Sequence, residues 1–145
     1  MSKYNVSANK ASRTYDGIVF DSVLEMRYYM DVCIAGLATG LYTTVSRQVP
    51  YVLQDKFKCH DKAVRAITYV ADFVLEYSDG HIEIIDVKGM ATNEALMKRK
   101  LFQYKYPLET LIWISYSKQD GGWIDFYQLQ KLRRERKKIK TVKEK

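Results

Sequence analysis

The chain has 145 residues, of which 47% are apolar and only two are proline, so it is large and apolar enough to fold as one domain. No apolar run approaches the ~20 residues that cross a bilayer, and the first residues lack the apolar core of a signal peptide. Two cysteines are too few for a disulfide framework. These features exclude a membrane-spanning or disulfide-stapled protein and predict a reduced, cytoplasmic one.

The net charge of +7 is concentrated at the C-terminal end of the chain. Residues 131–145 contain nine Lys or Arg and two Glu, whereas residues 1–130 contain fifteen basic and fifteen acidic residues. Such a tail suits a polyphosphate, because each phosphate that it neutralises releases a counterion. The alternatives are a solubilising tail and one that binds an acidic protein. We expect nucleic acid to be bound by basic residues of this tail, namely Arg133, Arg134, Arg136, Lys137 and Lys138.

The first part of the chain predicts a flexible polar arm, a helix, a strand and a loop, over residues 1–17, 22–34, 45–53 and 54–64 respectively. Ser22 and Glu25 have the spacing of a capping box, which starts the helix, and Gly36 or Gly40 ends it. Pro50 favours an edge position for the strand, because proline cannot donate a ladder hydrogen bond.

The remainder predicts two strands, a helix, a buried strand and a final helix, over residues 65–77, 82–88, 92–104, 110–116 and from 123 onward. The final helix is expected to dissolve into the basic tail at about residue 131, so the folded domain covers residues 18–130. The element order α-β-β-β-α-β implies an α+β fold in which helices flank a mixed central sheet.

The strand at residues 82–88 ends in a charged pair. Because side chains alternate between the faces of a strand, Asp86 and Lys88 emerge on the same side. On the preceding strand, Asp72 lies inside an apolar run, where an unpaired carboxylate is costly. Glu25, on the first helix, is a third acid that can reach the same cleft.

The length of the hairpin loop decides whether Asp72 faces Asp86. A two-residue Asp79-Gly80 turn would place the two acids on opposite faces of the sheet, whereas a three-residue loop over 78–80 would set them directly opposite each other. We predict the three-residue loop, or a bulge that restores its parity, with Gly80 in a left-handed conformation.

Two carboxylates opposite each other on neighbouring strands lie about 5 Å apart at Cβ, and they repel unless a cation or a proton intervenes. Oxygen-only ligands suit Mg²⁺ or Mn²⁺. We predict a metal site formed by Asp72, Asp86 and the Val87 carbonyl, with Glu25 as a ligand directly or through water. Lys88 would position a nucleophilic water or the phosphate. The alternatives are that Glu25 only caps its helix and that Asp86 and Lys88 form a simple ion pair.

Other polar groups carry weaker signals. On the helix after the charged pair, Lys98, Arg99 and Gln103 are predicted DNA contacts, although a solvated helix face explains them equally well. The run Cys59-His60-Asp61 resembles a zinc ligand cluster, but no second Cys or His lies at a metal-binding spacing.

Taken together, Glu25, the segment 70–73 around Asp72 and Asp86-Val87-Lys88-Gly89 resemble the motif of the PD-(D/E)xK nuclease superfamily, over residues 18 to 117. Ala71 stands where the motif usually has proline. The resemblance implies a restriction-endonuclease-like core that covers residues 18–130. It also implies one or two Mg²⁺ ions held by the three acids, with Lys88 assisting the attacking water.

Within that superfamily the chain is similar to small phage nucleases of the endonuclease I type, which resolve four-way (Holliday) DNA junctions as dimers. The resemblance implies a homodimer that cuts branched DNA during phage recombination or replication, in the cytoplasm of a bacterial host. The rivals are a nuclease of the same fold that nicks, restricts or degrades other DNA, and a DNA-binding protein without catalytic activity.

Overall fold

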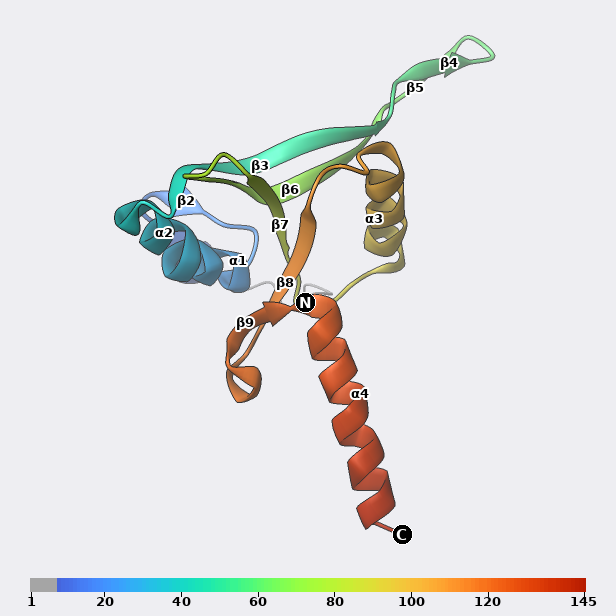
Figure 1. Ribbon diagram of the computed structural model, residues 1–145. Coiled ribbons are helices and arrows are strands. Elements are labelled where there is room, and N and C mark those ends of the chain that lie inside the picture. Colours follow the sequence, from blue (N-terminus) through green and yellow to red (C-terminus); the bar gives the residue numbers. More distant parts are fainter. Residues whose placement is uncertain (1–7) are drawn as a thin grey trace.

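A mixed sheet of five strands forms the centre of the computed structural model, which describes residues 8–145 (Figure 1). The order across the sheet is β3 (Tyr42–Gln54), β6 (Ile67–Tyr77), β7 (Ile82–Val87), β8 (Leu111–Ser117) and β9 (Gly122–Asp125). Only β7 and β8 are parallel. The predicted α+β class and mixed sheet are confirmed, and the strand that contains Pro50 does lie at an edge.

Helices cover both faces of the sheet. On one face lies a continuous helical segment built from α1 (Val23–Tyr28), the π-helical turn η2 (Tyr29–Ile34) and α2 (Ala35–Thr39). On the other face lies α3 (Asn93–Lys105), capped as predicted by Thr92. Adjacent residues of β7 belong to the two separate cores: Ile85 packs with Tyr28 of α1, and Ile84 packs with Phe102 of α3.

The predicted N-terminal arm has regular structure over the part that is described. A short 3₁₀ helix, η1 (Lys10–Arg13), leads into a small hairpin of β1 (Thr14–Tyr15) and β2 (Ile18–Val19). The rest of the predicted arm, residues 1–7, lies outside the described residues.

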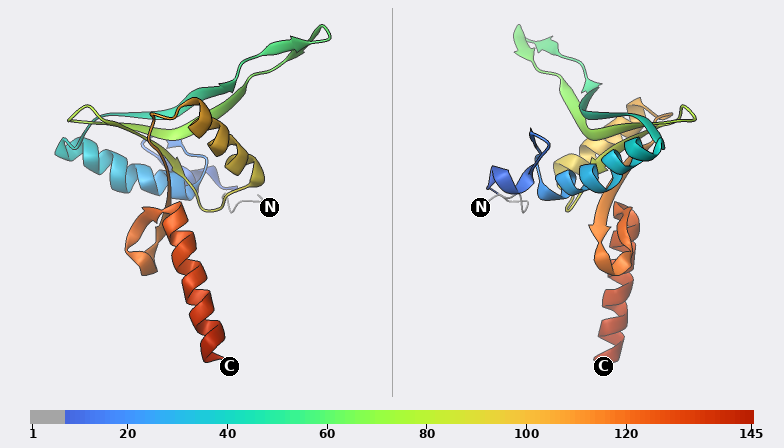
Figure 2. Two further views of the ribbon diagram at one scale, coloured as in Figure 1. Left: turned by 45° about the vertical axis from the view of Figure 1, so that its right-hand side comes forward. Right: turned by 90° about the vertical axis from the view of Figure 1, so that its left-hand side faces the viewer.

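The loop predicted over residues 54–64 is wrong. The chain forms a second hairpin there, with strands β4 (Phe57–Cys59) and β5 (Lys62–Val64), which projects from the body (Figure 2). His60 and Asp61 form its turn, and both have left-handed backbone conformations, with φ of 48° and 63°. A two-residue turn of this kind usually contains Asn-Gly or Asp-Gly, so the His-Asp pair concealed it.

The C-terminal helix also differs from the prediction. It begins at Phe126, because residues 122–125 form the edge strand β9 and the side chain of Asp125 caps the helix by accepting a hydrogen bond from the Gln128 N–H at 3.0 Å. The helix, α4 (Phe126–Lys143), continues through the predicted tail, since Lys and Arg are good helix formers. It extends away from the sheet (Figures 1 and 2). Across residues 8–145, none of the helices is both long and apolar enough to cross a membrane.

Candidate active site

The hairpin between β6 and β7 brings the two strand acids together. Phe73 pairs with Ile85, and the same register continues to the loop of residues 78–80, in which Gly80 has φ of 90°. The paired residues end at Phe73 and Ile85, and Asp72 and Asp86 come next on the two strands. A hydrogen bond between their side chains shows that the two acids meet. The predicted three-residue loop and the facing of the two acids are therefore confirmed.

Strand β6 changes the face that it presents at Asp72. Tyr69 and Ala71 pack in the core under α3, whereas Phe73 packs in the core under α1, although all three are odd-numbered residues. Strict alternation would place them on one face, so the pattern shifts by one residue at Asp72. On the neighbouring strand, Gln48 lies opposite this point, between the pairs that flank it, and has a left-handed φ of 50°. The acid and the amide therefore lie where both strands depart from regular geometry.

Asp86 is 5% exposed and is held by two donors. The hydroxyl of Tyr69 donates to its Oδ2, and Lys88 Nζ lies 3.1 Å from the same oxygen. The Tyr69 hydroxyl in turn accepts a hydrogen bond from Trp113 Nε1 at 2.8 Å. Asp86 and Lys88 do point the same way, as predicted, and a chain of buried donors fixes the orientation of the carboxylate.

Asp72 accepts a hydrogen bond on Oδ2 from the Val87 backbone N–H at 2.8 Å, and its Oδ1 lies 3.5 Å from Gln48 Nε2. Burial raises the pKa of Asp72 well above its ordinary value, and the negative charges of Asp86 and Glu25 raise it further. A hydrogen bond with Asp86 acts in the same direction by favouring the protonated form.

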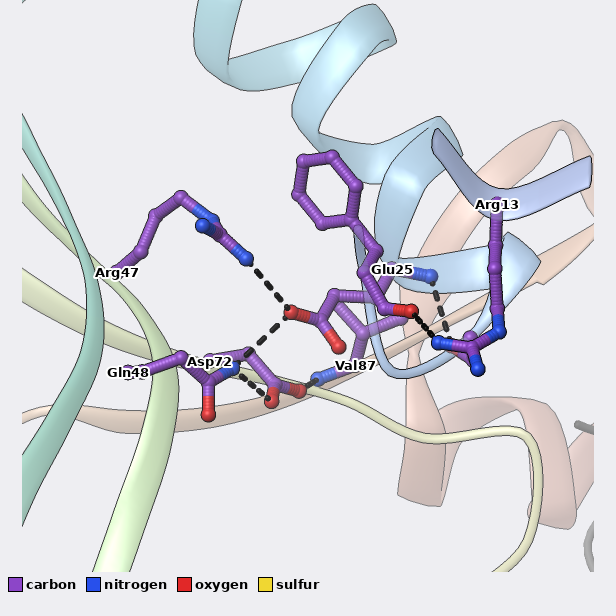
Figure 3. A network of polar contacts seen from close by, with 8 residues as sticks. Arg13, Glu25, Arg47, Gln48, Asp72 and Val87 are labelled. Carbon is purple, nitrogen blue, oxygen red and sulfur yellow. Dashed lines mark hydrogen bonds and ion pairs between the residues drawn. The ribbon is translucent and has the colours of Figure 1, made fainter. Parts of the chain in front are cut away.

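Glu25 lies in the first turn of α1 and faces Asp72 across the Gln48 amide (Figure 3). Gln48 Nε2 donates to Glu25 Oε1 at 3.1 Å, and an Arg47 guanidinium nitrogen lies 3.8 Å from the same oxygen. The carboxylate is 2% exposed, and burial together with the charge of Asp21 raises its pKa to about 7, although Arg47 and Gln48 oppose the shift. Gln48 therefore links two acids from different elements.

Glu25 does more than cap a helix. The cap itself is made by Ser22, whose side chain accepts a hydrogen bond from the Glu25 N–H at 3.0 Å, and this contact leaves the carboxylate turned toward Gln48. The raised pKa of both Glu25 and Asp72 identifies a buried cluster of acids that disfavours its own negative charge, a property that a cation would reverse.

The donor set fits a hard divalent cation, because carboxylate and carbonyl oxygens are the preferred ligands of Mg²⁺ and Mn²⁺. As the side chains stand, however, no group of three or more His, Cys, Asp or Glu within residues 8–145 could hold a metal ion. Asp72 and Asp86 face each other as a pair, and Glu25 is joined to Asp72 through Gln48.

The predicted DNA contacts of α3 have different surroundings. Lys98 lines a cavity of about 280 Å³ together with Asp86 and Lys88, and its Nζ lies 3.4 Å from Glu94. Gln103 is exposed. The Arg99 guanidinium lies over the rings of Trp113 and Tyr127, at 4.8 Å and 4.9 Å from their centroids, so the alternative of a solvated helix face does not describe it, and its contact with DNA stays a prediction.

Among the predicted contacts of α4, Arg136 is committed to a structural ion pair. Its two terminal nitrogens lie 2.6 Å and 3.0 Å from the carboxylate oxygens of Asp120. Arg133 and Arg134 line a second hollow, of about 450 Å³, together with Gly89 of the motif. These two arginines therefore lie beside the end of β7, whereas the exposed Lys137 and Lys138 lie further along the helix.

Two buried residues of the site escaped the sequence analysis. Tyr69 and Trp113 had the appearance of core residues, since each lies in a strand rich in apolar residues. A signal was nevertheless present, because a buried tyrosine hydroxyl or indole N–H requires a hydrogen-bond partner, and in this structure the partners lead to Asp86.

The family model that matches the chain is described as a protein of unknown function (DUF1064), and the match covers residues 1–121. The chain belongs to the DUF1064 family. The matched range contains every residue of the acidic site, whereas α4 lies beyond it. No curated protein is significantly similar to the chain. Because the description of DUF1064 names no activity, the function has to be inferred from the site itself.

Proposed function

We propose that the protein is a metal-dependent endonuclease that hydrolyses phosphodiester bonds in DNA, with branched DNA such as four-way junctions as its substrate. The observation that carries this proposal is the contact between the side chains of Asp72 and Asp86, with Lys88 beside Asp86. The spacing matches the nuclease motif to which the sequence is similar. The two acids face each other only because the β6–β7 loop has three residues, and a loop of two residues would have placed them on opposite faces of the sheet.

The cation in this proposal is Mg²⁺ or Mn²⁺. Asp72, Asp86 and the Val87 carbonyl would hold it, with Glu25 contributing through water, because Gln48 and Arg47 already contact the Glu25 carboxylate. When bound, such an ion lowers the pKa of a bound water and stabilises the charge that develops on the phosphate.

The chain's own residues position the reactants. Lys88 donates hydrogen bonds to the attacking water or to a phosphate oxygen, and Tyr69 keeps the Asp86 carboxylate in one orientation. In the reaction, the water oxygen forms a new bond to phosphorus, one bridging P–O bond breaks, and the leaving oxygen takes up a proton. Burial keeps these groups in fixed positions, which lowers the entropic part of the barrier.

DNA is the substrate that the surroundings of the site favour. Arg133 and Arg134 lie beside Gly89, and further cations follow along α4. The preference for branched DNA and the homodimer come from the resemblance to junction-resolving nucleases. Cleavage of another DNA substrate by the same site is the nearest rival, and DNA binding without catalysis is the rival from a different class.

Four-way, flapped and linear duplex DNA of matched sequence, each incubated with the protein in Mg²⁺, in Mn²⁺ and in EDTA, separate these functions. We expect metal-dependent cutting of the four-way junction in preference to the linear duplex. Metal-dependent cutting of the linear duplex alone would leave the nuclease but reject the junction. Binding without cutting under any of these conditions would reject the nuclease.

The variants Asp72→Asn, Asp86→Asn and Lys88→Ala should each reduce the cleavage rate by at least about 100-fold, because each removes a charge that acts on the reacting groups. DNA affinity measured in EDTA should change little, since the cations of α4 are intact. The matched control is Asp79→Asn, which neutralises an exposed carboxylate in the β6–β7 loop and should cut normally. Equal loss of cutting in the control would contradict the assignment.

A further inference from the structure

The hairpin of β4 and β5 presents two different faces to solvent. Phe57 pairs with Val64, and Cys59 pairs with Lys62, so these four side chains share one face. The other face carries the pair of Lys58 and Ala63. Lys56 and Arg65 flank the paired strands, and they line one hollow of about 420 Å³ together with Lys58 and Ala63, at which Phe57 and Val64 also lie. Lys56, Lys58, Ala63 and Arg65 form the basic face of the ribbon.

Nothing in the described chain neutralises the basic face. Lys56, Lys58 and Arg65 are exposed, and none of them forms an ion pair with any of residues 8–145. The hairpin also projects clear of both helical layers, as the two views of Figure 2 agree. An isolated two-stranded hairpin is only marginally stable in water, so a ribbon of this kind gains most from a ligand that orders it.

We propose that the β4–β5 ribbon is a second nucleic-acid contact, which lays its basic face along the phosphates of a duplex arm of the substrate. The inference rests on the proposed function in taking DNA as the substrate. A two-stranded ribbon, whose strands lie about 4.8 Å apart, fits the major groove of B-DNA, which is about 12 Å wide. Three cations that converge on one face supply the complementary charge.

The ribbon and the acidic site can reach the same duplex. Val64 precedes Asp72 by eight residues, so even a fully extended chain separates them by at most about 28 Å. One turn of B-DNA measures about 34 Å. The ribbon at Val64 therefore lies within one helical turn of a scissile phosphate placed near Asp72, and the same duplex can contact both.

A second copy of this chain is the less favourable occupant of the basic face. Two basic faces brought together would repel, and the whole chain already carries a net charge of +7. The apolar pair on the other face, Phe57 and Val64, is 45% and 36% exposed, and it is bordered by Lys62 rather than by further apolar side chains.

The test compares Lys58→Ala with Lys62→Ala, which remove the same charge from adjacent positions of one ribbon but from opposite faces. The full-length proteins are titrated against a labelled short duplex and a four-way junction in EDTA, across about 50 to 200 mM salt. We expect Lys58→Ala to weaken binding and to reduce the slope of log K against log salt by about one. Lys62→Ala should leave the slope unchanged. The double variant Lys58→Ala/Arg65→Ala should reduce it by about two.

Each other outcome overturns the proposal. Equal effects of Lys58→Ala and Lys62→Ala would mean that only net charge matters, and unchanged slopes would mean that the ribbon does not touch phosphate. Unchanged slopes with a lower mass in sedimentation for Phe57→Ser would make the ribbon a contact between copies. These titrations need no metal, so they test binding independently of cutting. If Lys58→Ala leaves both the salt slope in EDTA and the cleavage of the same DNA in Mg²⁺ unchanged, the ribbon contact is rejected but the proposed nuclease is not.

Discussion

Gln48 holds a left-handed backbone conformation inside β3, with φ of 50°, and its side chain joins Glu25 to Asp72. A non-glycine residue held in this region costs on the order of 1 kcal/mol or more, and such residues cluster at functional sites. This backbone conformation places the Gln48 amide between the carboxylate of Glu25 on α1 and that of Asp72 on β6. The positive φ of Gln48 thus lowers the stability of the fold at a residue that contacts two acids of the proposed site.

This strain predicts an inversion of the usual order of stability in a strand. Glycine normally destabilises a strand relative to alanine, but at position 48 we expect Gln48→Gly to be more stable than Gln48→Ala by about 1 kcal/mol, because only glycine adopts the positive φ without a steric penalty. Both variants lose the amide and should cut DNA more slowly than the parent protein. Urea unfolding of the two variants measures the difference. A more stable alanine variant would show that the backbone at residue 48 is not strained.

At the scale of single elements, the sequence predicted best where local chemistry has one solution. The β6–β7 hairpin was predicted from Gly80 and from a loop of three residues, which together fix which residues of β6 and β7 pair with each other. The helix before the site followed from the capping residue Ser22. Both predictions rest on interactions among residues close in sequence, so they do not depend on contacts with distant parts of the fold.

The elements that the sequence did not predict depend on subtler signals. The β4–β5 ribbon turns at His60-Asp61, without the glycine that marks such turns. Residues 123–125 were predicted to begin the final helix but belong to the strand β9, because residues 122–125 pair with β8, a contact that no local pattern specifies. In the site, the link between Trp113, Tyr69 and Asp86 crosses three strands, so it becomes visible only once their order in the sheet is known.

The helix α4 allows the electrostatic role of the basic tail to be separated from its structural one. Deletion of residues 131–145 should weaken DNA binding and flatten its salt dependence, but it also removes Arg136 and the ion pair with Asp120. A cleaner variant keeps Arg136 and replaces the four exposed cations that lie around it with glutamine. These four are Arg133, Arg134, Lys137 and Lys138.

For this four-site variant we expect an intact fold, weaker DNA binding and a salt slope reduced by up to about four, one for each lost phosphate contact. Circular dichroism checks the helix, and fluorescence anisotropy across a salt series checks the slope. The matched control replaces four exposed lysines elsewhere, Lys10, Lys100, Lys105 and Lys118, which changes the net charge equally. A slope that falls as much in the control would show that α4 makes no specific contact with phosphate.

At the scale of the whole molecule, the acidic site links stability to pH. The pKa of Glu25 is raised from 4.5 to about 7, chiefly by burial, so the folded state binds this proton more tightly than the unfolded state does. The contribution of this carboxyl group to stability is fully present below pH 4.5, falls as the pH rises and is gone above about pH 7. The shift corresponds to about 3 kcal/mol, and the raised pKa of Asp72 acts in the same direction.

We therefore expect the metal-free protein to melt at a lower temperature at pH 8 than at pH 5, by several degrees. Glu25→Gln should flatten this dependence, because it removes the titrating group. Adding Mg²⁺ at pH 8 should raise the melting temperature of the parent protein, since a ligand that binds only the folded state stabilises it, but should not raise that of Asp86→Asn. Calorimetry measures each temperature. A melting temperature that rises between pH 5 and pH 8, or an equal response of Asp86→Asn to Mg²⁺, would contradict the electrostatic account of the site.

The two cysteines differ in a way that makes the projecting ribbon experimentally addressable. Cys33 is enclosed in the core beneath the first helix, whereas Cys59 is exposed next to the turn of the ribbon. A maleimide dye or spin label applied to the folded protein would therefore attach at one place only. Because Cys59 shares its face with Lys62, the probe would lie on the opposite side of the ribbon from Lys58, which we propose contacts phosphate, and would report the approach of the ribbon to DNA without blocking it.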